Sequence, residues 1–182
     1  MRDEKTRTVA LTGMLFALAI ALSFLESAIT PLLGLLPAMK LGLSNIVVMY
    51  ALLFINKRQA LALVILKALF AFLTRGATAG FLSLCGGLLS FGVLCLLLAI
   101  PMQISGYIFS AAGALAHNLG QLAGAAVILS SGMAVAYAPV LMISGLIVGY
   151  VTYWIFKSVE PYFRKMSGFQ TKNVKNMFKK KS

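Results

Sequence analysis

Residues 113–121 read GALAHNLGQ and lie inside an uninterrupted apolar run over residues 104–129. In a helix the glycines, the histidine and the glutamine of this stretch fall on one side, at spacings of three and four. Small residues on such a face allow close approach between membrane helices, so we expect the face to look inward. Polar side chains at membrane depth are costly and by default mark a functional site. We therefore predict that His117, Asn118 and Gln121 form part of a binding pocket, with interhelical hydrogen bonding as the alternative.

The composition of the whole chain indicates a membrane protein. Of 182 residues, 60% are hydrophobic and 11% are charged, and the mean hydropathy is +0.94. Such a chain lacks the polar surface that a soluble domain needs. Because a helix needs about 20 apolar residues to cross a bilayer, we predict an all-α integral membrane protein. It would have six transmembrane helices over residues 1–157 and a basic tail over residues 158–182. The expected spans are about residues 9–28, 39–55, 59–73, 77–100, 104–129 and 135–156.

Basic residues are concentrated at the two ends of the chain. The formal net charge is +12, from 16 Lys and Arg against 4 Asp and Glu. Eleven of the basic residues lie in the two terminal tails, and Lys57 and Arg58 lie in the turn after the second expected span. Because cytoplasmic loops of membrane proteins are enriched in Lys and Arg, we place both termini in the cytoplasm of a multi-pass cell-membrane protein. The charge then faces the anionic lipids of the bilayer, and we expect no nucleic-acid partner.

With this topology, the polar side chains gather in the outer half of the bundle. Lys40, Lys67 and Arg75 share that half with the single negative charge of Glu26. Unpaired cations at depth are costly, so we expect an outward-facing pocket for a small anionic ligand, whether a carboxylate, a phosphate or a diphosphate. The alternative is that Glu26 forms a structural bridge with Lys40 or Arg75 while the other cations snorkel. The predicted pocket residues are Lys40, Asn45, Arg75, His117, Asn118 and Gln121, with Glu26, Lys67, Ser44 and Ser83 as supports or a gate.

Several kinds of catalytic and metal chemistry lack their residues in this sequence. The acidic residues are Asp3, Glu4, Glu26 and Glu160, and they do not form the aspartate-rich motifs with which a prenyl diphosphate synthase holds Mg²⁺. No G-x-x-x-x-G-K-[ST] loop is present, so we expect no ATP hydrolysis by this chain. One histidine and two cysteines ten residues apart do not make a bis-histidine haem, zinc or iron–sulfur site. We therefore expect no catalytic residue, no metal and no cofactor.

Three segments carry a family resemblance. They are PAMKLGLSNI at residues 37–46, RG at 75–76 followed by FLSLCGGLLS at 81–90, and GALAHNLGQ at 113–121. Together they resemble the Gx transporter family, also called heptaprenyl diphosphate synthase component I, over residues 8–156. The family usually has Pro-Gly before the motif lysine and Ala at the position of Ser44. This chain has Pro-Ala-Met and Ser there, and neither change removes a polar group.

The resemblance implies a six-helix membrane protein similar to the substrate-binding S components of energy-coupling factor (ECF) vitamin transporters. In those proteins a small-residue face on the first helix docks on a shared transmembrane coupling subunit that two ATPases drive. Small residues recur four apart in the first expected span of this chain, at Gly13, Ala17 and Ala21. Such a stripe is typical of a helix-docking face, and the resemblance assigns it to the coupling partner.

The leading hypothesis is therefore a substrate-binding membrane subunit of an uptake transporter. Its ligand would be a small anionic molecule related to a vitamin or an isoprenoid, taken up with energy from partner ATPases. A second hypothesis is a membrane accessory subunit of prenyl diphosphate or quinone synthesis, which holds a soluble synthase at the bilayer through the basic tail. A third is a membrane partner of a flavin or quinone electron-transfer system.

Overall fold

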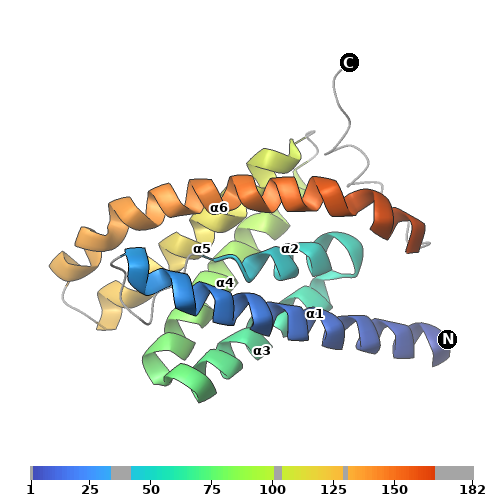
Figure 1. Ribbon diagram of the computed structural model, residues 1–182, viewed down its shortest axis with the longest axis horizontal. Coiled ribbons are helices and arrows are strands. Elements are labelled where there is room, and N and C mark those ends of the chain that lie inside the picture. Colours follow the sequence, from blue (N-terminus) through green and yellow to red (C-terminus); the bar gives the residue numbers. More distant parts are fainter. Residues whose placement is uncertain (1, 34–41, 101–103, 129–130, 167–182) are drawn as a thin grey trace.

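The computed structural model describes residues 2–33, 42–100, 104–128 and 131–166. The regular elements in these ranges are all helical, as predicted, and comprise six α-helices and one short 3-10 helix. Figure 1 shows α1 and α6 running along the length of the molecule. The helices are α1 (Arg2–Ile29), η1 (Thr30–Leu33), α2 (Asn45–Phe54), α3 (Lys57–Arg75), α4 (Ala77–Ala99), α5 (Gly106–Ile128) and α6 (Ser131–Met166).

Three of these helices contain segments long and apolar enough to cross a membrane. The segments are Thr8–Ile29 in α1, Ala77–Ala99 in α4 and Ala138–Ile155 in α6. Helix α2 is apolar but shorter, with ten residues. Helix α3 includes Lys67 and two basic residues in its first turn. The fold is thus an all-helical one that is compatible with a bilayer.

Two of the corners between helices follow signals that are visible in the sequence. Asn56 precedes α3, and its side chain accepts a hydrogen bond of 2.8 Å from the backbone N–H of Gln59, as an N-cap residue does. Gly76 separates α3 from α4 with a φ of +90°, a conformation that favours glycine. Its N–H makes the last helical hydrogen bond of α3, to the carbonyl of Phe72, and its positive φ ends the helix after Arg75.

Several helix boundaries differ from the ends of the expected spans; helix α1, for example, begins at Arg2, seven residues before the first expected span. Helix α2 begins at Asn45, six residues after the expected start, and residues 34–41 lie outside the described ranges. Gly42 has a φ of +96°, and its carbonyl accepts from the N–H of Asn45, so a turn precedes the helix. Helix α6 continues to Met166, past the expected boundary at 157, because basic residues do not stop a helix whose backbone bonds continue.

Glycines set the close packing of α4 and α5 with each other and with α6. A Cβ atom on Gly120 would lie 2.6 Å from the carbonyl oxygen of Cys85, and one on Gly86 would lie 2.7 Å from that of His117. Between α5 and α6, a Cβ atom on Gly149 would lie 2.6 Å from the Cα of Ala111. These distances leave no room for a side chain, which is the packing expected of small residues between membrane helices. The face of residues 113–121 predicted to look inward is buried.

Candidate functional site

The carboxylate of Glu26 is buried at the start of α2. Glu26 is fully buried, and its Oε1 accepts hydrogen bonds from the N–H of Gly42 and, at 2.6 Å, from that of Leu43. Its Oε2 accepts from the N–H of Ser44 at 3.4 Å. The carboxylate therefore satisfies the donors of the turn that leads into α2 and complements the positive end of the helix dipole.

Lys67 lies close to this carboxylate on the neighbouring helix α3. Its side chain is 9% exposed, and Glu26 attracts its positive charge. Among the described residues, the Lys67 ammonium forms neither a hydrogen bond nor an ion pair within 4 Å. A buried cation without a direct partner is costly, so Lys67 is a candidate for anion binding.

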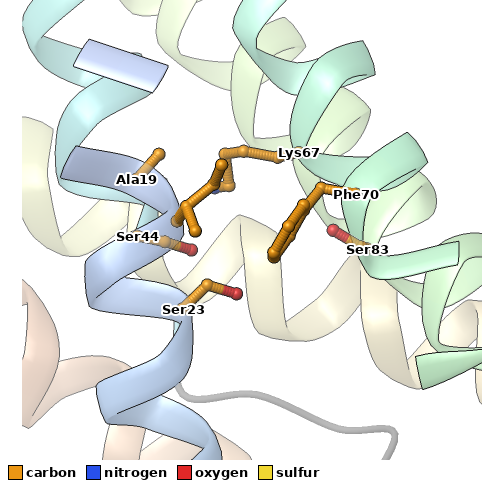
Figure 2. Close-up of a pocket in the computed structure, with 7 residues that line it drawn as sticks. Ala19, Ser23, Ser44, Lys67, Phe70 and Ser83 are labelled. Atoms are coloured by element: carbon orange, nitrogen blue, oxygen red, sulfur yellow. The ribbon is translucent and has the colours of Figure 1, made fainter. Parts of the chain in front are cut away.

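A hollow adjoins Lys67. Its volume is about 230 Å³ when the space that opens to the outside is included. Lys67 reaches from α3 toward α1 (Figure 2), and Ser23 and Ser44 bring hydroxyl groups from α1 and from the start of α2. Hydroxyl groups can donate hydrogen bonds to an anion. The full lining is Ala19, Ile20, Ser23, Ser44, Lys67, Phe70 and Ser83.

Arg75 adds a second cation at the end of α3. It is partly buried, and its Nη1 atom is buried without a hydrogen-bond partner in the described part of the chain. Glu26 attracts its charge as well. Among the described residues, backbone N–H groups donate to Glu26, and the alternative of a bridge from Glu26 to Lys40 stays a prediction. Lys40 itself lies outside the described ranges.

The amide of Asn118 joins α5 to α6. Its Nδ2 donates to the carbonyl of Leu141 at 2.6 Å and to the hydroxyl of Ser144 at 3.4 Å. This is the interhelical hydrogen bonding that sequence analysis left open as an alternative. Gln121 is buried on the same helix.

His117 fills the space between two glycines. A Cβ atom on Gly42 would lie 3.0 Å from its ring, and one on Gly86 would lie 2.9 Å from it. The imidazole therefore packs between α4 and the turn before α2. His117 does not line the hollow at Lys67, and neither do the other described residues of the predicted pocket, which are Asn45, Arg75, Asn118 and Gln121.

Asn45 belongs to a second buried polar group, between α2, α4 and α5. Its Nδ2 donates to the hydroxyl of Ser90 at 2.5 Å, and that hydroxyl donates to the carbonyl of Gly113 at 2.8 Å. The Oδ1 of Asn45 has no donor among the described residues. Asn45 lines a hollow of about 210 Å³, a volume that includes space open to the outside, together with Ser110 and Thr152.

Comparison with known protein families identifies the family of this chain. Residues 15–159 match the family described as heptaprenyl diphosphate synthase component I. The chain belongs to this family. No curated protein and no solved structure matches the chain. All three segments that carried the resemblance to this synthase component I family fall within the matched range. The structure does not describe residues 37–41 of the first segment.

Four residues that line the hollow of this component I protein were not predicted from the sequence, namely Ala19, Ile20, Ser23 and Phe70. Ser23 lies three residues before Glu26, and Phe70 lies three residues after Lys67. Residues three apart share a face of a helix, so the position of the two charged residues could have identified Ser23 and Phe70. Ser44, Ser83 and Lys67, which were predicted as supports or a gate, do line the hollow.

The small-residue stripe of α1 faces outward. Gly13, Ala17 and Ala21 are exposed, and a Cβ atom on Gly13 would meet nothing within 4 Å. Large apolar side chains beside the stripe, such as Met14 and Leu18, are exposed as well. Within the part of the chain that is described, no other helix covers this face.

The hydrogen-bonded chain from Asn45 to Gly113 gives a testable prediction for stability. Ser90→Ala leaves the Asn45 amide without its acceptor and the Gly113 carbonyl without its donor. We expect the free energy of unfolding to fall by about 1–3 kcal/mol, measured by SDS titration of the detergent-purified protein. Ser158→Ala is the control, because that exposed hydroxyl bonds to a carbonyl of its own helix. An equal effect of both substitutions would contradict the prediction.

Proposed function

We propose that this protein is the substrate-binding membrane subunit of an uptake transporter and that its ligand is a small anion. The proposal rests on Lys67, a buried cation that borders a hollow with serine hydroxyl groups. The nearby acid, Glu26, has its two oxygens engaged by backbone N–H groups. Since Glu26 neutralises at most one of the charges of Lys67 and Arg75, the site has an excess of positive charge. An excess of this kind favours an anionic ligand.

In this proposal the chain crosses the cell membrane six times, with both termini in the cytoplasm. The hollow lies in the outer half of the bundle and receives the ligand, related to a vitamin or an isoprenoid, from outside. The exposed stripe of Gly13, Ala17 and Ala21 docks on a transmembrane coupling subunit, and ATPases bound to that subunit supply the energy. The absence of a phosphate-binding loop from the sequence is why the proposal includes them.

Thermal unfolding in the presence of cell extract tests this proposal. The small-molecule extract is separated on an anion-exchange column, and each fraction is added to the detergent-purified protein. We expect an anionic fraction to raise the midpoint temperature of the wild type by about 5 °C. Lys67→Met should lose this shift, whereas Lys57→Met, an exposed lysine of the same helix, should keep it. An equal shift in Lys67→Met, or a shift caused by the uncharged fraction, would contradict the proposal.

The family description favours a second candidate function, an accessory membrane subunit of prenyl diphosphate synthesis. In that case the protein would hold a soluble synthase at the bilayer, and Lys67 would be dispensable. Affinity purification with the wild type, with Lys67→Met and with a chain that ends at residue 166 separates the two functions. A prenyl synthase that is retained by Lys67→Met and lost on truncation would favour the accessory subunit.

A further inference from the structure

The turn that leads into α2 is an anion site that already contains a carboxylate. We infer that the N–H groups of Gly42, Leu43 and Ser44 form the seat for a carboxylate group of the ligand, and that Glu26 occupies this seat while the ligand is absent. The inference rests on the proposed function and narrows its ligand from an anion to a carboxylic acid. It also assigns to Glu26 the role of a competitor that the ligand must displace.

The hydrogen bonds of Glu26 define the chemistry of the seat. One carboxylate oxygen takes two consecutive N–H groups and the other takes the third. Consecutive N–H groups at a helix start point toward a common anion, and the helix dipole adds a favourable field. The donors thus match a group with two acceptor oxygens and one charge. A phosphate would bring a third oxygen and additional charge, for which these three N–H groups offer no donor.

Lys67 is the second observation that points to a ligand. Ser44 is shared by the turn before α2 and the hollow at Lys67. Its N–H donates to Glu26, and the residue also lines the hollow. An incoming carboxylate in the hollow therefore lies next to the donors that Glu26 occupies. By displacing Glu26, the incoming carboxylate would gain those three N–H donors and would lie beside the ammonium group of Lys67. The Lys67 side chain is 9% exposed and has no direct partner among the described residues.

Few side chains of helix α1 are buried against the rest of the described chain. Of the α1 side chains that are described, three are buried, namely Leu15, Ala19 and Glu26. Between Met14 and Leu25, most of the other side chains are partly or fully exposed. A movement of α1 that withdraws Glu26 would therefore break few buried apolar contacts.

Competition between Glu26 and an added carboxylate can be measured on the full-length protein in detergent. The probe is butyrate, with butyramide as the matched uncharged compound and inorganic phosphate as the other anion. The midpoint of thermal unfolding is recorded against probe concentration. Glu26→Gln keeps an acceptor oxygen for the turn and removes the charge. We expect it to lower the concentration of butyrate for half-maximal stabilisation by about tenfold, with no response to butyramide.

Each outcome separates the inference from the proposed function. If Glu26→Gln leaves the butyrate concentration unchanged or raises it, Glu26 is not a competitor, and the inference fails while anion binding stands. A response to phosphate at lower concentrations than to butyrate would overturn the choice of a carboxylate in the same way. Lys67→Met is introduced into the wild type and into Glu26→Gln. Loss of the butyrate response in both cases would support a site that Lys67 shares with the turn before α2. If no anion stabilises either the wild type or Glu26→Gln, the proposed function fails together with the inference.

Discussion

Gly120→Val is expected to lower the free energy of unfolding by about 3 kcal/mol or to prevent folding altogether. The Cβ atom of any new side chain would lie 2.6 Å from the carbonyl oxygen of Cys85 and 2.7 Å from the Cα of Gly86. Both of these are backbone atoms, which cannot turn away as a flexible side chain can. Helices α4 and α5 would have to separate, and the contacts of His117 and Ser90 between them would be lost.

Gly92→Val is the matched control for this substitution. Gly92 is an exposed residue of α4, and a Cβ atom there would meet nothing within 4 Å. SDS titration of both variants in mixed micelles, followed by circular dichroism, should show a normal transition for Gly92→Val. A normal transition for Gly120→Val as well would mean that α4 and α5 are not packed as closely as described.

Glu26→Leu is expected to cost about 3 kcal/mol or more of unfolding free energy. The substitution leaves the N–H groups of Gly42, Leu43 and Ser44 without an acceptor, and each buried unsatisfied group costs about 1–3 kcal/mol. Lys67 also loses the nearby charge that attracts it. Glu26→Gln, which retains one acceptor oxygen, should cost less than half as much in the same SDS titration. If Leu and Gln have equal effects, the carboxylate does not hold the turn.

The elements that sequence analysis predicted well are those set by local signals. The inward face of residues 113–121 follows from the spacing of its glycines, and the corner at Gly76 follows from a residue that adopts a positive φ. Both signals act within a few residues, so a single sequence contains them. The apolar composition likewise indicates helices that suit a membrane.

Contacts between distant parts of the chain could not be predicted in this way. The start of α2 depends on Glu26, which precedes Gly42 by 16 residues and lies on another helix. Gly42 and Ser44 are residue types that often precede a helix, but the expected span did not use this signal. Helix α6 continues to Met166, past the expected end of the sixth span at residue 156, because the change to basic residues after Phe156 alters the surroundings of the helix without stopping it.

The hollow at Lys67 is lined by residues expected as supports or a gate and by none of the described residues that were expected to bind the ligand. Periodicity indicates which residues share one face of a helix, but it does not indicate which neighbour that face meets. Lys67, Ser44 and Ser83 come together at the hollow, whereas Asn118 bonds to Leu141 on α6. The order in which the helices pack decides this division, and it depends on the close approach of α4, α5 and α6 at their glycines.

The central claim, an anion held at Lys67, is tested most directly by native mass spectrometry of the protein purified in mild detergent. The account predicts that the wild type and Lys57→Met retain one small anion, whose identity follows from its mass after release, and that Lys67→Met does not retain it. A wild type without any bound small molecule, or the same mass retained by Lys67→Met, would contradict the account.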